Sequence, residues 1–414
     1  MNKNVKTALI PKYRFWEFVE NGPVICENGN LIFKQVSNKT HNSDLPILAI
    51  SQEYGAIPRD EIDYKVSVTE KSLESYKVVE KGDFIISLRS FQGGIEYSTY
   101  HGICSPAYII LRKKIDVEEQ YYKYYFKSNR FIQDLNKDLE GIRDGKMVNY
   151  NQFSNILLPK PDKKEQQKIA DCLISLDDLI TAEDKKLSAL KDHKKGLMQK
   201  LFPVEGKTVP EWRFPEFRDC EEWEYFKLSD IGEIITGSTP ATNKNEYYGG
   251  QFMFASPSDI SDKRYLNSTK TTLSELGFQQ TRHIKANSIL FVCIGSTIGK
   301  LAQNREVCAT NQQINSLVPF ENYHNSFVYF ALEFSSNVIS NLAGKQAVPI
   351  VNKTLFSNVV IPLPLEKKEQ EKISDCLSSV DELIAGQADK IKALKEQKKG
   401  LMQGLFPSIE EVSR

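Results

Sequence analysis

Lys163–Leu201 reads KKEQQKIADCLISLDDLITAEDKKLSALKDHKKGLMQKL, and Lys367–Leu405 reads KKEQEKISDCLSSVDELIAGQADKIKALKEQKKGLMQGL. The two stretches align without a gap at a constant offset of 204 residues, and Phe-Pro follows each of them. Self-similarity over such a length is the signature of a repeated structural unit rather than of a short motif. We therefore predict that the protein consists of two related halves, each ending in the same long element.

Apolar residues in both copies recur at alternating four- and three-residue steps, which is typical of a coiled-coil seam. The seam positions are Ile169, Leu173, Leu176, Ile180, Leu187, Leu190, Leu197 and Leu201 in the first copy, and Ile373, Leu377, Val380, Ile384, Ile391, Leu394, Leu401 and Leu405 in the second. Polar residues interrupt both seams at the same two places, Glu183 and Lys194 against Gln387 and Lys398. We predict two paired helices, each about 55 to 60 Å long at about 1.5 Å per residue.

The length of 414 residues and the 40% hydrophobic content predict a soluble chain of two or more domains. No apolar run approaches the length of a membrane span, and the start of the chain lacks the apolar core of a signal peptide, so we expect a cytoplasmic protein. Seven cysteines without a Cys-x-x-Cys pair argue against a disulfide framework and a zinc cluster. The balanced charge, 54 basic and 54 acidic residues, neither supports nor excludes nucleic acid.

Each half opens with a similar leader, PKYRFWEF at Pro11–Phe18 and PEWRFPEF at Pro210–Phe217. Short β-type runs separated by Gly, Pro and Asn follow each leader, so we predict an α/β globule in each half. The predicted strands are Leu31–Val36, Ile47–Ile50, Asp83–Leu88, Ala107–Leu111, Ile231–Ile235, Ser288–Ile294 and Gln313–Val318, and the predicted helices are Tyr121–Leu139 and Phe327–Leu342. A final strand in each half, ILLPKP or VVIPLP, ends at a proline that fixes where the long helix begins.

The connections between these parts predict their arrangement. Only about six residues, Val204 to Val209, join the first helix to the second leader, a reach of roughly 20 Å. The second globule must therefore lie at the far end of the first helix, and the second helix must run back antiparallel to the first. We predict an α/β protein with two globules, residues 1–160 and 204–364, separated by two long antiparallel coiled-coil helices, residues 161–203 and 365–414. The repeat is pseudo-twofold, and the C-terminal end returns to the first leader.

The sequence contains stretches that look like catalytic motifs but lack residues that those motifs need. Gly295–Lys300, GSTIGK, resembles a phosphate loop, but it is one residue short between its glycines and Leu301 replaces the hydroxyl that would hold magnesium. Asp184 and Lys186 superficially complete a metal-nuclease motif, yet they belong to a long helix where a solvated face is the simpler interpretation. The histidines have no ligand spacing; they are His41, His101, His193, His283 and His324. We therefore expect no catalytic residue, no cofactor and no metal site.

The remaining polar clusters are suited to contacts with DNA. Asn311, Gln312 and Gln313 carry amides of the kind that pair with adenine, and Arg89 and Lys300 are of the kind that pair with guanine or phosphate. The stretch Arg89-Ser90-Phe91-Gln92-Gly93-Gly94 occupies the position of GSTIGK in the first half. The candidate DNA contacts are Arg89, Ser90, Gln92, Ser238, Thr239, Lys300, Asn311, Gln312 and Gln313. Ordinary loop residues remain the alternative, as does a solvated face for the lysine-rich helix ends.

The chain resembles the specificity subunit of type I restriction-modification systems along nearly all of its length. The resemblance is carried by the two EQ-x-K-I helix openings, the two KKGLMQ-x-LFP endings, the leaders, and GSTIGK followed by TNQQI at Thr310–Ile314. It implies that each globule is a target recognition domain for one half of a split double-stranded DNA site, with the helix pair as spacer. It also implies two methyltransferase subunits, translocating restriction subunits and no chemistry in the chain itself. The first globule departs from the pattern, with SFQGGI and CSPAYI in place of GSTIGK and TNQQI.

A function of another class is a non-catalytic scaffold, in which the coiled coil carries two protein-binding globules. Salt-dependent DNA binding separates the two hypotheses, because a protein scaffold has no DNA counterions to release.

Overall fold

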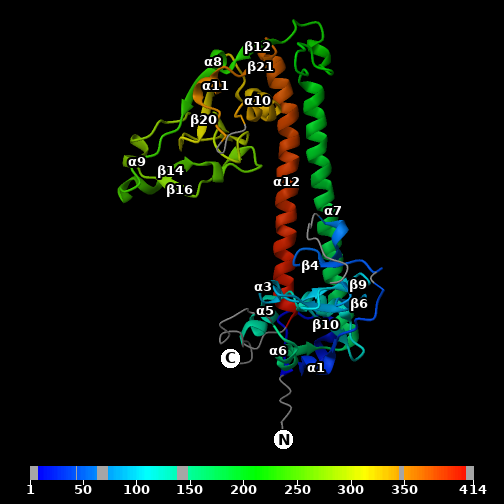
Figure 1. Cartoon of the computed structure of the whole chain (residues 1–414). Coiled ribbons are helices and arrows are strands. Elements are labelled where there is room, and N and C mark those ends of the chain that lie inside the picture. Colours follow the sequence, from blue (N-terminus) through cyan, green and yellow to red (C-terminus); the bar gives the residue numbers. More distant parts are fainter. Residues whose placement is uncertain (1–7, 43, 63–72, 138–147, 345–348, 407–414) are drawn as a thin grey trace. The chain divides into compact units, whose positions relative to one another are not determined.

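The computed structural model describes residues 8–42, 44–62, 73–137, 148–344 and 349–406. These residues form two compact units (Figure 1). Unit 1 contains the chain up to Ala182 together with the part from Ile391 onward, and unit 2 is Glu183–Lys390. The repeated stretches form the 39-residue helices α7 (Lys163–Leu201) and α12 (Lys367–Leu405), so each unit holds one half of both helices.

The helices pair antiparallel within each unit. In unit 1, Ile169 and Leu173 near the start of α7 share a hydrophobic cluster with Leu405 at the end of α12. In unit 2, Ile373 and Leu377 near the start of α12 share a cluster with Leu201 at the end of α7. All of the predicted seam positions are buried or half-buried, while the residues between them are mostly exposed. The antiparallel pairing expected from the chain's connections is therefore present in both units.

Unit 1 is built around a four-stranded antiparallel sheet in the order β3 (Phe33–Val36), β10 (Ile109–Lys113), β7 (Phe84–Ile86), β8 (Glu96–Tyr97). Beside it are a sheet of β1 (Ala8–Leu9), β2 (Val24–Asn28) and β11 (Leu157–Lys160), and the pairs β4 (Leu48–Ser51) with β5 (Gly55–Pro58) and β6 (Lys77–Val79) with β9 (Gly102–Cys104). Its short helices are α1 (Gly29–Ile32), α3 (Ser90–Gly93), α4 (Glu119–Tyr125), α5 (Asn129–Asn136) and α6 (Tyr150–Asn155).

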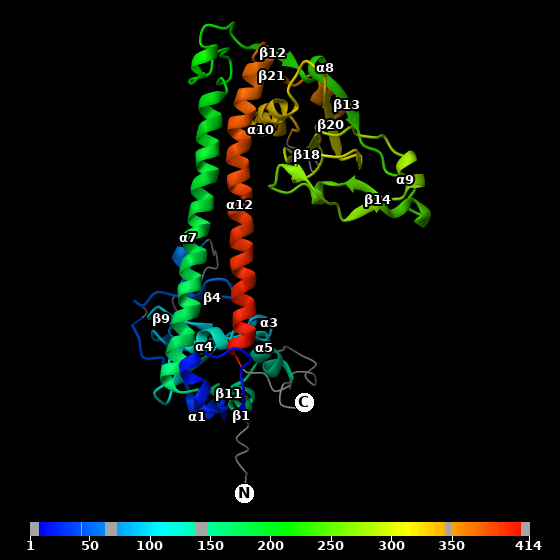
Figure 2. The same ribbon diagram turned by 180° about the vertical axis from the view of Figure 1, so that it is seen from behind.

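Unit 2 is built around a five-stranded sheet in the order β13 (Gly232–Thr236), β20 (Ile314–Pro319), β17 (Ile289–Val292), β18 (Leu301–Asn304), β15 (Tyr265–Leu266). Further strands are β12 (Glu224–Lys227) with β21 (Val360–Leu363), and β14 (Tyr248–Ala255) between β16 (Thr271–Leu273) and β19 (Ala309–Thr310). Its helices are α8 (Leu228–Ile231), α9 (Glu275–Gln279), α10 (Asn325–Asn341) and α11 (Lys353–Ser357), and α10 lies beside the first half of α12 in both views (Figures 1 and 2).

The two globules have the same underlying sheet. The order β3-β10-β7-β8 in unit 1 matches β13-β20-β17-β18 in unit 2, and the pair β2-β11 matches β12-β21. The two halves of the repeat thus share a sheet topology as well as the long helix. Strands overlap all seven predicted ranges, although the first residues of Leu31–Val36 belong to α1.

The helix expected at Tyr121–Leu139 is broken in two. α4 ends at Tyr125 and α5 begins at Asn129, because the Ser128 hydroxyl caps the second helix by accepting a hydrogen bond from the Phe131 backbone N–H. The last two residues of the expected range lie outside the described residues. No helix in the described part of the chain is long and apolar enough to cross a membrane.

Candidate nucleic-acid interface

The glutamates of the two EQ-x-K-I openings anchor each leader to its own long helix. In unit 1, Arg14 Nε and Nη2 each lie 2.8 Å from a carboxylate oxygen of Glu165. In unit 2, Arg213 makes the same two-pronged contact with Glu369 at 2.8 and 2.7 Å. Both glutamates are almost fully buried, and the Glu369 carboxylate raises the pKa of Arg213 through these hydrogen bonds. Planar two-point pairing of this kind fixes orientation as well as charge.

The glutamines of the same openings attach each globule to its helix. The Gln166 side chain accepts from the Glu118 backbone N–H at 2.9 Å and donates to the Pro161 carbonyl at 2.8 Å. Gln370 does the same with His324 and Pro364, both at 2.9 Å. The EQ-x-K-I motif is therefore structural: it positions the leader and the globule on the first turn of the long helix.

Each leader also contacts the end of a long helix. The Trp212 backbone N–H donates to the Lys200 carbonyl at 2.9 Å, and the Tyr13 N–H donates to the Gly404 carbonyl at 2.8 Å. Lys200 and Gly404 are repeat mates, and a Cβ at Gly404 would lie 2.0 Å from the Tyr13 ring. The end of α12 thus meets the first leader inside unit 1, as the connections predict.

In unit 2, most candidate DNA contacts gather at one edge of the five-stranded sheet. Thr236 at the end of β13 is paired with Asn315, and Val292 at the end of β17 is paired with Ile314 at the start of β20. The loops that follow β13 and β17, and the loop that precedes β20, therefore emerge at the same edge. These loops carry Ser238, Thr239, Lys300, Asn311, Gln312 and Gln313.

The polar side chains at this edge are held by one another. Thr239 Oγ1 donates to Oε1 of the exposed Gln312 at 2.6 Å, and the Asn311 amide donates to Oε1 of Gln313 at 3.0 Å. A Cβ at Gly237 would lie 2.1 Å from the Asn311 carbonyl, so only glycine permits the two loops to approach. Preformed loops of this kind present amides in fixed orientations.

Arg282 is a member of this cluster that sequence analysis did not identify. Its backbone N–H donates to Ser238 Oγ at 3.0 Å, and its guanidinium donates to the Thr236 carbonyl at 2.8 Å. The side chain is exposed at the same sheet edge. No motif around Arg282 predicts this position, because the contact depends on chain folding between residues more than 40 apart.

Gly295–Lys300 forms a β-hairpin loop, not a phosphate loop. The Val292 N–H donates to the Lys300 carbonyl at 2.8 Å, and Gly295 and Gly299 both have a φ of 93°. β18 follows the loop directly, whereas a phosphate loop needs a helix N-terminus at that point. The exposed Lys300 ammonium lies 3.8 Å from Asp262.

In unit 1, the corresponding edge carries Arg89 and Gln92. Ile86 at the end of β7 is paired with Ile109 at the start of β10, and the connection between β7 and β8, which includes the one-turn helix α3, contains both exposed side chains. Ser90 differs from the expectation, since it is buried and its hydroxyl accepts from the Ser87 N–H at 2.9 Å. This hydroxyl shapes the loop and is unsuited to contact a base.

Three side chains from other elements hold the Arg89–Gly94 loop, the second feature that sequence analysis missed. Gln52 donates to the Arg89 carbonyl at 3.0 Å, Asn136 to the Phe91 carbonyl at 2.7 Å, and Lys127 to the Gly93 carbonyl at 3.0 Å. The loop is therefore fixed at both ends. A fixed loop can present Arg89 and Gln92 in defined orientations.

The described residues give little support for a metal site or a reactive cysteine. No three His, Cys, Asp or Glu side chains there gather where they could hold a metal ion. Burial raises the pKa of Cys26 to about 11 and those of Cys104, Cys293 and Cys308 to about 12, so these thiols are poor nucleophiles at neutral pH.

A family model described as the type I restriction modification DNA specificity domain matches the chain twice, at residues 14–192 and 220–396. The chain belongs to the family of type I restriction-modification specificity subunits. Specificity subunits of this family are the non-catalytic, DNA-recognising components of type I systems, and the two matches correspond to the two halves of the repeat.

Named specificity subunits are similar to this chain over most of its length. The type I restriction enzyme HindI specificity subunit from Haemophilus influenzae is 24% identical over 361 residues, which cover 70% of this chain and 78% of that protein. The EcoR124I/EcoR124II specificity subunit from Escherichia coli is 29% identical over 248 residues, 57% of each chain.

Two solved structures from type I systems share the fold. The crystal structure of the type I S subunit from M. genitalium aligns with a TM-score of 0.59 and 13% identity, over 97% of this chain and 100% of that one. A chain from a study of complex assembly and conformational transition in a type I system aligns with a TM-score of 0.55 and 18% identity, over 92% and 97%. At such identities the likeness concerns the fold alone.

Proposed function

We propose that the two units of this specificity subunit each recognise one half of a split double-stranded DNA site. The observation that carries the proposal is the equivalent sheet edge in the two units, which presents different polar side chains. Arg89 and Gln92 are exposed at this edge in unit 1, whereas Gln312, Arg282 and Lys300 are exposed at it in unit 2. Different side chains on equivalent scaffolds give two unlike half-sites, and hence an asymmetric target.

The proposed base contacts follow from the chemistry of the exposed groups. Gln312 is suited to adenine, because its amide offers one donor and one acceptor in the plane of the base edge. Thr239 already donates to its Oε1, which fixes the amide while leaving Nε2 to donate. Arg89 and Arg282 are suited to guanine or to phosphate, and Lys300 to phosphate. Ser238, Asn311 and Gln313 act in this proposal by holding the loops.

The helix pair is proposed as the spacer between the half-sites. Recognition domains would occupy residues 1–160 and 204–364, and spacer helices residues 161–203 and 365–414. Since α7 and α12 are each continuous over 39 residues, a fixed number of unrecognised base pairs would separate the half-sites. We further propose that two methyltransferase subunits dock on the repeated helices, that restriction subunits join this core, and that the assembly works in the cytoplasm.

DNA binding by the subunit assembled with its methyltransferase separates this proposal from the scaffold alternative. A recognition subunit would bind duplex DNA with an affinity that falls linearly with salt on logarithmic axes, because neutralised phosphates release counterions. It would also prefer one split sequence over random duplex. Assembly without salt-dependent DNA binding would instead favour a protein scaffold.

A further inference from the structure

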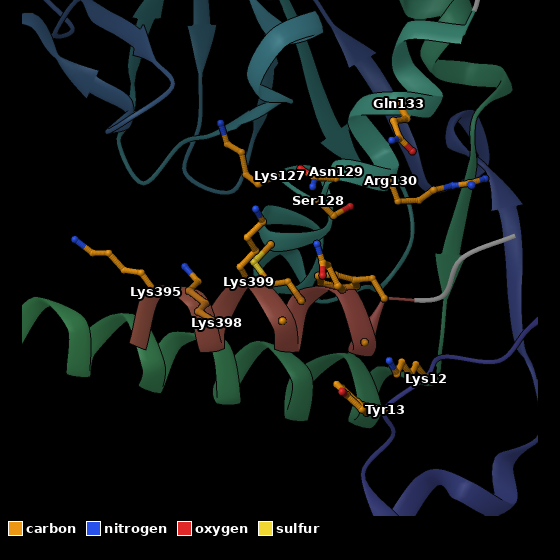
Figure 3. A pocket seen from close by; sticks show the side chains of 15 residues that line it. Lys12, Tyr13, Lys127, Ser128, Asn129, Arg130, Gln133, Lys395, Lys398 and Lys399 are labelled. Atoms are coloured by element: carbon orange, nitrogen blue, oxygen red, sulfur yellow. The ribbon is translucent and has the colours of Figure 1, made fainter. Parts of the chain in front are cut away.

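A cationic cavity in unit 1 lies next to the proposed recognition loop. The cavity measures about 780 Å³, and among the described residues no acidic side chain lines it. Lys395, Lys398 and Lys399 of α12 form one wall, and residues just before and at the start of α5, including Lys127 and Arg130, form the opposite wall (Figure 3). Lys12 and Tyr13 of the leader lie at one end (Figure 3).

Part of this positive charge is balanced and part is not. Lys127 pairs with Glu96, Arg130 with Asp134 at 2.7 Å and Lys398 with Asp177 at 2.5 Å, each with the carboxylate outside the lining. The exposed Lys12 and Lys399 form no ion pair with a carboxylate of the described residues. The cavity therefore presents excess positive charge, together with neutral donors such as Asn129 and Gln133.

The equivalent place in unit 2 has acidic side chains at two positions where unit 1 has basic ones. Lys398 lies over the Tyr124 ring, and its repeat mate Lys194 lies over Phe330 in the same way, at 5.0 and 5.2 Å from the ring centroids. Glu333 follows Phe330 by three residues, as Lys127 follows Tyr124, so Glu333 occupies the position of Lys127. The Glu333 carboxylate binds Lys194 at 2.7 Å.

The leaders also differ in charge, because the second leader has Glu211 at the position of Lys12 in the first. The three lysines of α12 that line the cavity recur in α7 as Lys191, Lys194 and Lys195, so the difference lies mainly in the globules and leaders. The cationic cavity is thus a property of one end of the repeat and does not follow from the shared helix sequence.

The cavity is physically connected to the loop that carries Arg89. Lys127, which lines the cavity, donates to the Gly93 carbonyl of that loop at 3.0 Å. A protein that contacts bases through Arg89 and Gln92 also contacts the backbone phosphates beside those bases, and lysine is a common partner of such phosphates.

We propose that this cavity binds backbone phosphates that flank the half-site recognised by unit 1. The proposal rests on the function proposed above and adds to it a phosphate-binding site that unit 2 lacks at the equivalent place. Lys12 and Lys399 supply the unbalanced charge. The site contributes affinity and positioning without distinguishing bases. The affinity of unit 1 for its half-site should therefore fall more steeply with salt than the affinity of unit 2 for its own.

The test uses the full chain assembled with its methyltransferase subunit and two double variants of equal charge change. Lys12→Gln with Lys399→Gln alters the cavity, and Lys185→Gln with Lys195→Gln alters exposed lysines of α7, Lys195 being the repeat mate of Lys399. Binding to a 30-base-pair random duplex is measured across a salt series. The slope of log K against log salt is negative. Its magnitude should fall by about 1.8 in the cavity variant, because each of the two lost phosphate contacts contributes about 0.9, and it should be unchanged in the control.

Each other outcome overturns the proposal in a distinguishable way. A cavity variant with the wild-type slope shows that the cavity binds no phosphate, although the wild-type DNA binding keeps the proposed function intact. Equal losses in both variants indicate a general charge effect. A cavity variant that binds DNA normally but separates from the methyltransferase in gel filtration shows that the cavity docks an acidic protein segment. A wild-type complex that binds no DNA refutes the proposed function as well.

Discussion

Glu183 and Gln387 occupy the same position in the two helix copies, 204 residues apart, and hydrogen-bond to each other. Gln387 Nε2 lies 2.6 Å from Oε2 of Glu183 and 3.0 Å from its backbone carbonyl, and Lys390 lies 2.5 Å from the other carboxylate oxygen. These hydrogen bonds hold the pKa of Glu183 below its ordinary value. A polar pair inside an apolar seam fixes register at some cost in stability.

Replacing this polar pair should therefore raise stability and loosen register. Gln387→Leu alone removes the amide partner of Glu183 and should lower the thermal midpoint by about 2–4 °C. The double variant Glu183→Leu with Gln387→Leu should recover the wild-type midpoint or exceed it. Circular dichroism melting provides the measurement. A double variant less stable than the single one would contradict this account of the seam.

The buried pair of Arg213 and Glu369 should be far more sensitive to a single substitution. Arg213→Met leaves the fully buried Glu369 carboxylate without its cation, and such a loss costs about 3–5 kcal/mol. Arg213→Met combined with Glu369→Leu should recover most of that loss, since no charge remains buried. Urea unfolding of both variants measures the free energies. A cost below about 0.5 kcal/mol for the single variant, typical of surface sites, would show that the pair does not anchor the leader.

His324 should make unit 2 less stable as the pH falls. Its backbone N–H binds Gln370, and burial lowers the pKa of its imidazole, with Lys367 and Arg264 opposing protonation and Glu371 and Asp375 favouring it. The folded state therefore binds the proton less tightly than the unfolded state, and stability is lost as pH falls through the ordinary value near 6.5.

Comparison of two histidine variants isolates this effect. His324→Gln should flatten the decline in thermal midpoint between pH 7.5 and 5.5, and His193→Gln, at an exposed position of α7, should not. Parallel declines in the wild type and both variants would assign the pH dependence to other groups.

Gln312→Ala should alter recognition in one half-site only. A bidentate contact to one base contributes about 1–3 kcal/mol of discrimination, or roughly 5- to 150-fold. Methylation rates on duplexes with substitutions in each half-site measure the effect, with Gln199→Ala on the exposed face of α7 as the control. Uniform weakening on all sequences would indicate a phosphate contact or a folding defect instead.

Inserting one heptad into both long helices should lengthen the gap between the half-sites. Seven residues keep the seam in register and add about 10 Å, which corresponds to at most about 3 base pairs. The methylated sequence of the inserted variant reports the new gap. An unchanged gap would show that the helices do not set the spacing.

Sequence reasoning succeeded where the signal is periodic or repeated. The seam, the antiparallel pairing and the equivalence of the Arg89 and Lys300 loops all follow from spacing along the chain. It failed where tertiary contacts decide. Arg282 and Gln52 reach the recognition loops from distant segments, and Ser90 is buried as a loop cap. The cationic cavity could not be predicted either, because its walls come from three distant segments: the leader, α5 and the end of α12.

The most direct test of two recognition units on one spacer is sequencing of modified bases in DNA methylated by the wild-type complex. We predict one split, asymmetric motif, with two unlike half-sites separated by a constant number of unspecified base pairs. A continuous motif, two independent motifs or a variable gap would contradict the account.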